Sequence, residues 1–185
     1  MSKDDMMALF ATLKKDYSVI LDIGSRTGCV LFAAHLMTKC ERIIGIEIEQ
    51  GWVDISRKVA QKFEMEGWLF SQRILGWTRE NAHFKTVFSD RIEIHNENIA
   101  NKKGLNLLSE ADLVIMHNPF EWFSKEKGEK EFELMKSNFK KGAIIVTLPS
   151  IESQSISIEG WCENITPKEG PWRDELKEFS LYKAI

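Results

Sequence analysis

An acid and a glycine-rich turn are the first residues in this chain whose types and spacing could do chemistry. The segment VILDIGSRTGCV, residues 19–30, is a short apolar run that closes with Asp22 and then passes through Gly24 and Gly28. Glycines after a strand let the backbone approach a ligand closely, and the amino end of a following helix favours a carboxylate or phosphate. A tight strand-to-helix turn needs glycine as well, so this segment alone leaves both interpretations open.

A second acid and a later amide strengthen the interpretation as a binding site. Glu47 closes the next apolar run, RIIGIEIE, and an acid about twenty residues beyond the glycine turn can accept hydrogen bonds from both hydroxyls of a ribose. Asn98 follows a later strand-like segment, where its side-chain amide could pair with the edge of an adenine. A solvated acid and a turn-capping asparagine are the alternatives. Together, Asp22, the glycine turn, Glu47 and Asn98 predict a site for an adenosine compound.

Composition and missing motifs exclude several other chemistries. With 43% hydrophobic and 29% charged residues, the chain is typical of an ordinary globular protein, and its net charge of -3 gives no global field that attracts nucleic acid. Cys29, Cys40 and Cys162 form no CxxC pair and the four histidines are scattered, so we expect no disulfide and no metal site. The dinucleotide fingerprint and the phosphate-binding GxxxxGK[ST] loop are both absent.

The elements that must position these residues alternate along the chain. Continuous apolar runs predict buried strands and 3.6-residue spacing predicts helices. Expected helices cover 6–15, 29–40, 52–75 (with a break near Gly67) and 130–139, and expected strands cover 18–23, 42–49, 91–99, 111–120, 143–149, 155–161 and 178–185. We therefore expect one α/β domain over residues 1–185, with a Rossmann-like, mostly parallel sheet, helices on both faces and a C-terminal antiparallel strand. Ligands of such sheets bind at the carboxyl ends of the strands.

The motif DIGSRTG resembles the first motif of class I S-adenosylmethionine-dependent methyltransferases, acid-x-Gly-x-Gly-x-Gly. It keeps the acid and the outer glycines and has Arg26 at the position of the middle glycine. The resemblance implies S-adenosyl-L-methionine as cofactor. It implies that Glu47 binds the ribose, that Asn98 lies at the adenine, and that further cofactor-binding residues are Asp22, Gly24, Ser25, Gly28 and Asn118.

Residues 16–185 are similar to the non-SET histone-lysine methyltransferases of the disruptor-of-telomeric-silencing type. The shared features are the first motif, the strand end GIE at residues 45–47, the run HNPFEWF at 117–123, the return segment MKSNFKKGAIIVTLPSI, and TPKEGPW ahead of EFSLYKAI. A second comparison is with enzymes that methylate planar nitrogens through Asn-Pro-Pro-aromatic. This chain keeps Asn118, Pro119 and Phe120 but lacks one of the two prolines.

These resemblances imply transfer of a methyl group to nitrogen, with a protein lysine as the favoured acceptor. Asn118 and Phe120 are then the catalytic residues, and Pro119, Trp122 and Phe123 bind the substrate, the aromatic rings forming a narrow channel that favours a neutral lysine. Two alternatives stay open. One is N-methylation of adenine in RNA or DNA, or of a glutamine amide. The other is a catalytically inactive methyltransferase-like binding subunit.

The partners and the compartment follow from what the sequence lacks. Only residues 1–17 precede the first expected strand, whereas the resembled family has a helical lid there and also a basic nucleosome-binding tail. The missing lid leads us to expect a partner chain that completes the site. The protein substrate is implied by the resemblance, and nucleic acid stays possible but is not indicated by the charge. No apolar run is long enough to cross a membrane and the N-terminus lacks a signal-peptide pattern, so the expected location is the cytoplasm or nucleus.

Overall fold

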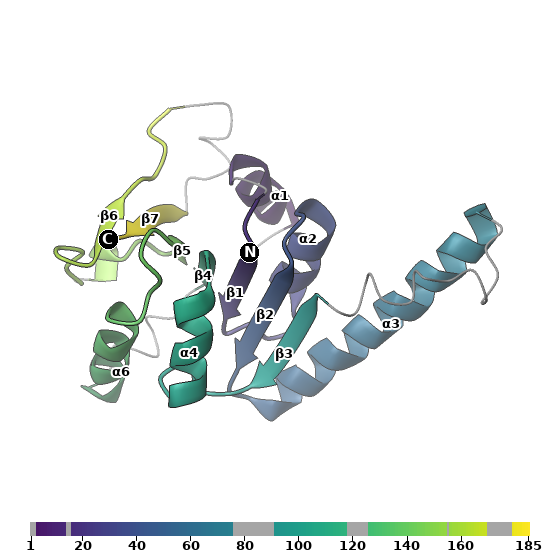
Figure 1. Ribbon diagram of the computed structural model, residues 1–185, viewed down its shortest axis with the longest axis horizontal. Helices are drawn as coiled ribbons and strands as arrows, with labels where there is room; N and C mark the ends of the chain where they lie inside the picture. Colours follow the sequence, from purple (N-terminus) through teal and green to yellow (C-terminus); the bar gives the residue numbers. More distant parts are fainter. Residues whose placement is uncertain (1–2, 14–15, 76–90, 118–125, 155, 170–178) are drawn as a thin grey trace.

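The computed structural model describes residues 3–13, 16–75, 91–117, 126–154, 156–169 and 179–185 (Figure 1). The strands are β1 (Val19–Ile23), β2 (Arg42–Glu47), β3 (Ile92–Asn96), β4 (Leu113–His117), β5 (Ile144–Leu148), β6 (Cys162–Asn164) and β7 (Ser180–Ala184). The helices are α1 (Lys3–Thr12), α2 (Cys29–Met37), α3 (Gln50–Leu75), α4 (Lys102–Glu110), α6 (Glu126–Lys136) and the short 3-10 helix η2 (Glu152–Gln154).

The strands form one sheet in the order β3-β2-β1-β4-β5-β7-β6. The pairs from β3 to β5 are parallel, whereas β7 runs antiparallel to both β5 and β6. The predicted fold class, a Rossmann-like α/β sheet with an antiparallel C-terminal strand, is therefore confirmed. The strand order reverses between β1 and β4, and sheets of this kind bind ligands at the carboxyl ends of the strands beside such a reversal.

Apolar side chains cover both faces of the sheet and define two cores. On one face Ile20 and Ile43 pack against α1 and α2 through Leu9 and Leu31. On the other face the alternate strand residues pack against α4 and α6. Full burial of one such leucine or isoleucine stabilises the fold by about 1.5–3 kcal/mol. Burial on both faces explains why these strands read as continuous apolar runs in the sequence.

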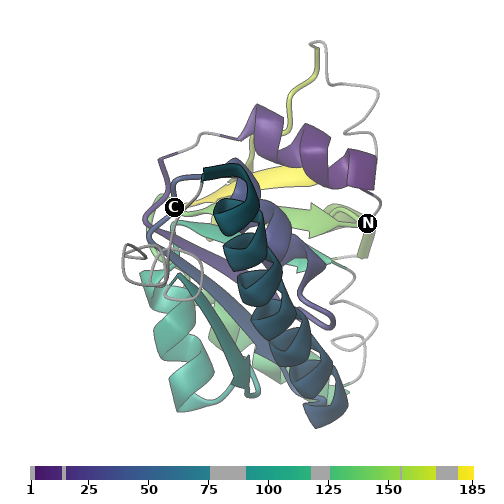
Figure 2. The same ribbon diagram turned by 90° about the vertical axis from the view of Figure 1, so that its right-hand side faces the viewer.

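Helix α3 runs for 26 residues and passes Gly67 without interruption, so the expected break there is wrong. It begins directly after β2 and extends well past the edge strand β3 (Figure 1), and Figure 2 shows it in front of the sheet. A single glycine in a helix is destabilising by only about 1 kcal/mol, which the flanking turns tolerate.

Two other elements differ from the sequence prediction. Helix α4 was not expected, although Asn101 caps it by accepting a hydrogen bond from the Gly104 N–H at 2.8 Å. The first antiparallel strand begins at Cys162 rather than within residues 155–161. Gly160 has a φ of 81° and the N–H of Trp161 bonds to the carbonyl of Ile158, which makes that segment a turn. The alternating apolar residues ahead of β6 pack on the core as a loop.

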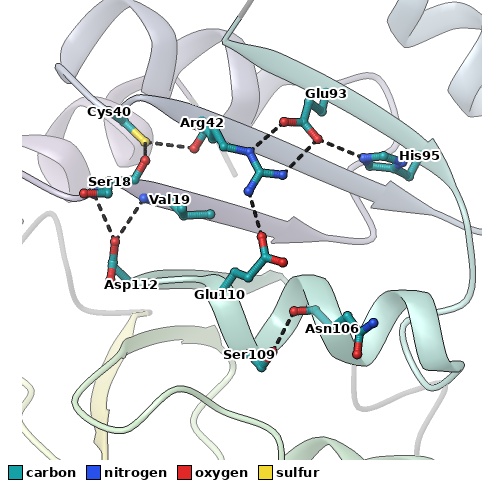
Figure 3. Close-up of polar contacts among 10 residues, drawn as sticks. All are labelled: Ser18, Val19, Cys40, Arg42, Glu93, His95, Asn106, Ser109, Glu110 and Asp112. Atoms are coloured by element: carbon teal, nitrogen blue, oxygen red, sulfur yellow. Dashed lines mark hydrogen bonds and ion pairs between the residues drawn. The ribbon is translucent and has the colours of Figure 1, made fainter.

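Ion pairs and hydrogen bonds hold the amino ends of the strands together (Figure 3). Arg42 at the start of β2 bonds Glu93 on β3 at 2.8 Å and Glu110 at the end of α4 at 2.7 Å. Asp112, just before β4, accepts the N–H groups of Ser18 and Val19, both at 3.0 Å. These contacts join β1, β2, β3 and α4 at the edge opposite the predicted ligand site.

The helices found in the described residues are all too short or too polar to cross a membrane.

Candidate functional site

The glycine turn after β1 folds onto the end of β2. The N–H groups of Gly24 and Ser25 both donate to the carbonyl of Ile46, at 2.8 and 3.1 Å, and the N–H of Gly28 donates to the carbonyl of Ser25 at 2.8 Å. Gly24, Arg26 and Gly28 have positive φ angles of 77°, 44° and 80°. The alternation of left-handed residues lets the chain reverse direction tightly before α2 begins. The turn is thus a fixed loop at the carboxyl edge of the sheet.

Glu47, the last residue of β2, lies against this turn. One carboxylate oxygen accepts the N–H of Arg26 at 3.0 Å, and the other accepts the N–H of Glu49 at 2.9 Å. The side chain is only 6% exposed, so its position is well defined. Each carboxylate oxygen offers more than one acceptor position, which leaves capacity for hydroxyl donors such as those of a ribose.

Asp22 shares this face of the sheet with Glu47. The register aligns Asp22 with Gly45, and Glu47 lies two residues further along β2 on the same side. Asp22 is 2% exposed, and burial together with the negative charge of Glu47 raises its pKa to about 7. Two predicted site residues are therefore brought together. A pair of close carboxyl groups favours a ligand that carries positive charge and hydroxyl donors.

The two glycines of the motif are in different surroundings. A Cβ added at Gly24 would meet no atom of the described residues within 4 Å, so among these residues the glycine leaves open space beside the turn. A Cβ at Gly28 would lie 2.5 Å from the Oγ of Ser56 on α3, and 3.1 Å from the ring of Phe32. Gly28 thus lets α2 and α3 pack closely, and the open cradle is at Gly24. The cradle, together with the Glu47 carboxylate, fits an adenosine-type ligand.

Ser25 and Asn98 differ in how their side chains are bound. The Ser25 Oγ is buried without a hydrogen-bond partner among the described residues and lies 2.8 Å from where a Gly45 Cβ would be, under the turn. Asn98 follows β3, where its side-chain oxygen accepts the N–H of Ala100 at 2.8 Å and its amide nitrogen is 3.5 Å from Glu131. Asn98 thus caps a turn at the carboxyl edge, and its role toward an adenine stays a prediction.

Sequence reasoning missed three contributors to the geometry around Glu47. The side-chain amide of Asn96 donates to the carbonyls of Glu47 and Ile48, at 3.2 and 2.9 Å. The N–H of Glu49 and the backbone N–H of Arg26 fix the carboxylate. The sequence does offer one indication that Arg26 is unusual: it stands in the glycine turn at the position where the motif has glycine. Asn96 ends β3 next to Glu47 in the register, which only the strand pairing reveals.

The remaining predicted residues lie outside the described part of the chain. These are Asn118, Pro119, Phe120, Trp122 and Phe123, all within residues 118–125. They follow β4, which pairs with β1, so the chain enters this segment at the carboxyl edge beside the glycine turn. Within the described residues, no three histidine, cysteine or acidic side chains are grouped as a metal site would need.

Comparison with known proteins gives a family match and a fold match. The family model described as "Histone methylation protein DOT1" matches residues 6–166. No curated protein matches the chain. A solved RNA methyltransferase from Salinibacter ruber, in complex with S-adenosyl-L-homocysteine, is 18% identical, with coverage of 100% of this chain and 92% of that one and a TM-score of 0.57. An O-methyltransferase from Bacillus cereus, also with S-adenosyl-L-homocysteine, is 11% identical, with coverage of 100% and 82% and a TM-score of 0.60.

Proposed function

The chain belongs to the DOT1 family of histone methylation proteins and is an S-adenosylmethionine-dependent methyltransferase, and from this premise we propose that it methylates the side-chain nitrogen of a protein lysine. The match to the family model over residues 6–166 is the observation that carries the proposal. A histone is the acceptor that the family's description suggests, and a protein lysine is the broader class that we propose for this chain.

The geometry at the carboxyl edge supports the cofactor-binding half of this activity. S-adenosylmethionine supplies an electrophilic methyl group on a positively charged sulfur. In our assignment the cradle at Gly24 lets the backbone approach the cofactor, and Glu47, held by two N–H groups, accepts the ribose hydroxyls. Asp22 adds a second buried carboxyl group on the same face, whose ionised form a positive charge favours. We assign the side-chain amide of Asn98 to binding of the adenine.

The acceptor half of the proposal rests on residues 118–123. In this proposal Asn118 orients the amine, and the aromatic side chains of Phe120, Trp122 and Phe123 keep water from the acceptor. A lysine must lose its proton before it can act as a nucleophile, and an apolar channel disfavours its charged form. Alignment of the nitrogen with the methyl group at near-attack distance then supplies much of the rate enhancement.

Transfer of a radioactive methyl group from the cofactor tests the proposal. The acceptor panel contains nucleosomes, free histones, a glutamine-rich peptide, single-stranded RNA and DNA. We expect label in protein, with mass spectrometry locating the added methyl on a lysine nitrogen. Label in adenine or on a glutamine amide would contradict the lysine assignment and favour the enzymes that share the Asn-Pro-aromatic pattern.

A matched pair of asparagine variants separates the acceptor role from cofactor binding. Asn118→Ala should abolish transfer while S-adenosylhomocysteine still binds. Asn106→Ala, at an exposed position on α4, should leave both unchanged. Full transfer by Asn118→Ala would show that Asn118 does not orient the amine.

A further inference from the structure

Arg26 stands in a backbone conformation that its side chain does not favour. Its φ of 44° lies in the left-handed region, where glycine and asparagine are the usual residues. A non-glycine residue held there against its preference often marks a functional position. In the motif this position belongs to glycine, so the chain has a long cationic side chain where glycine, which lacks a Cβ, would relieve the strain.

The surrounding hydrogen bonds hold this conformation in place. The Arg26 N–H donates to the Glu47 carboxylate at 3.0 Å, and the preceding N–H groups of Gly24 and Ser25 are bound to the carbonyl of Ile46. The bond to Glu47 uses only the backbone of Arg26. The guanidinium group is therefore not needed to build the turn, and its presence there calls for a separate explanation.

The guanidinium of Arg26 differs from those of the other arginines whose side chains are described. Arg42 bonds two carboxylates, Arg57 donates to the carbonyl of Ile94, and Arg91 donates to carbonyls at the end of α2. Arg26 is exposed, and within the described residues its guanidinium has no ion pair and no hydrogen bond. It is thus a cation at the glycine turn that no described residue binds.

Charge complementarity identifies the ligand group. The amino-acid end of the cofactor carries a positive ammonium group and a negative carboxylate. Asp22 and Glu47 can stabilise positive charge but would repel a carboxylate. A guanidinium binds a carboxylate through two parallel hydrogen bonds, and Arg26 lies in the turn between Gly24 and Gly28, where the methyltransferase resemblance implies that the methionine part lies.

We propose that Arg26 is a specificity-determining residue, whose guanidinium binds the carboxylate of the cofactor's methionine moiety. This assignment rests on S-adenosylmethionine being the cofactor and goes beyond it, since it predicts discrimination between ligands with and without that carboxylate. The backbone of the same residue holds Glu47 for the ribose. One residue thus acts on both ends of the cofactor by two separable contacts.

A pair of ligands and a pair of variants test the proposal by calorimetry. The ligands are S-adenosylhomocysteine and its decarboxylated analogue, 5′-deoxy-5′-(3-aminopropylthio)adenosine. Arg26→Gly keeps the N–H to Glu47, relieves the strain and removes the guanidinium, whereas Arg26→Lys keeps the charge. We expect the wild type to prefer S-adenosylhomocysteine by about tenfold, Arg26→Gly to lose this preference with unchanged affinity for the analogue, and Arg26→Lys to be intermediate.

The outcomes separate this proposal from the cofactor assignment. Arg26→Gly should melt at a temperature equal to or above that of the wild type, because the glycine suits the left-handed turn, so its weaker binding cannot be ascribed to misfolding. Equal binding of the two ligands by the wild type, or an equal loss of affinity for both in Arg26→Gly, would refute the proposed role of Arg26. The assignment of the cofactor would still stand. A wild type that binds neither ligand would overturn the assignment of the cofactor, and this proposal with it.

Discussion

The two edges of the sheet differ in how their acidic side chains are paired. At the amino edge, the carboxylates of Glu93, Glu110 and Asp112 each lie within 2.8 Å of an arginine or lysine nitrogen. At the carboxyl edge, Asp22 and Glu47 are both under 10% exposed, lie on one face and form no ion pair with any described residue. The amino edge thus neutralises its carboxylates with cationic side chains, whereas Glu47 at the carboxyl edge is held by backbone N–H groups only.

This difference indicates what each edge does. Paired charges at the amino edge link strands and helices and contribute to the stability of the fold. Buried like charges at the carboxyl edge destabilise the ligand-free protein, and such arrangements persist where a ligand uses them. Changes at the two edges should therefore separate stability from cofactor binding.

The largest expected effect is on binding, from Glu47→Gln. The amide keeps the size of the side chain but replaces one acceptor oxygen by an NH2 donor. This donor would face either a backbone N–H or a ribose hydroxyl and could not accept its hydrogen bond. Affinity for S-adenosylhomocysteine should fall by about 3 kcal/mol, roughly a hundredfold, in a calorimetric titration. The matched control at the amino edge is Glu93→Gln, which should leave the affinity unchanged. Equal affinities for the two variants would contradict the assignment of the ribose site.

The next effect is on stability, from Arg91→Ala at the amino edge. Arg91 donates to the carbonyls of Cys40 and His35, both at 2.9 Å, and contacts the His35 ring at 3.0 Å. Its removal leaves carbonyls at the end of α2 without these donors, and we expect the free energy of unfolding to fall by about 2 kcal/mol in a urea titration. Cofactor affinity should not change. A large loss of affinity would show that the two edges are not independent.

The third effect depends on pH and has opposite signs at the two edges. The pKa of Asp22 is about 7 in the folded protein and 3.8 is its ordinary value, so the folded state binds more protons between these values. The free energy of unfolding therefore falls as the pH rises from about 4 to 7. Asp22→Asn removes this dependence and should be more stable than the wild type by about 2 kcal/mol at pH 8, with the difference vanishing near pH 4.

Asp112→Asn is the comparison for this experiment. Burial raises the pKa of Asp112, but hydrogen bonds from Lys140 and from the N–H groups of Val19 and Ser18 outweigh it, so the pKa lies below its ordinary value. That carboxylate contributes stability above its unfolded pKa, and the stability is lost as the pH falls. Asp112→Asn should therefore destabilise the protein at neutral pH. If Asp22→Asn and Asp112→Asn changed the melting temperature at neutral pH in the same direction, the contrast between the two edges would be wrong.

The smallest effect comes from two glycines in similar local environments. Gly24 and Gly142 have φ angles of 77° and 83°, and a Cβ at either would meet no atom within 4 Å in the part of the chain that the structure describes. Substitution of either by alanine should lower stability by about 1 kcal/mol through backbone strain alone. Only Gly24→Ala should also weaken binding of S-adenosylhomocysteine. Unchanged binding by Gly24→Ala would show that the open space at Gly24 does not hold the cofactor.

The sequence predicted those elements whose signals are local. The apolar runs that become β1, β2, β4 and β5 are buried on both faces, and the fold class followed from their alternation with helices. Helix α4 was missed because its nine residues carry few apolar positions, although Asn101 is a readable cap. The first antiparallel strand was misplaced because alternating Ile156 and Ile158 pack on the core as a loop.

The site was predictable in its residue types but not in its contacts. The motif pointed to Asp22 and Gly24, the acid at the end of the next apolar run pointed to Glu47, and the strand order places them at one edge. The bond from the Arg26 N–H to Glu47 depends on a left-handed backbone that the residue type disfavours, so no propensity indicates it. Gly28 matches the motif, but it serves the close packing of α2 against Ser56 on α3, and only the arrangement of the helices reveals this role. Asn118 and the aromatic residues after it remain predictions.

An NMR titration with S-adenosylhomocysteine compares the two edges in one experiment. The amide protons of Arg26 and Glu49 donate to the carboxylate of Glu47, and that of Val19 donates to the carboxylate of Asp112. If the carboxyl edge holds the methyl donor, the Arg26 and Glu49 signals will shift on ligand addition and the Val19 signal will stay in place. Unmoved Arg26 and Glu49 signals at saturating ligand, or an equal shift at Val19, would contradict the account.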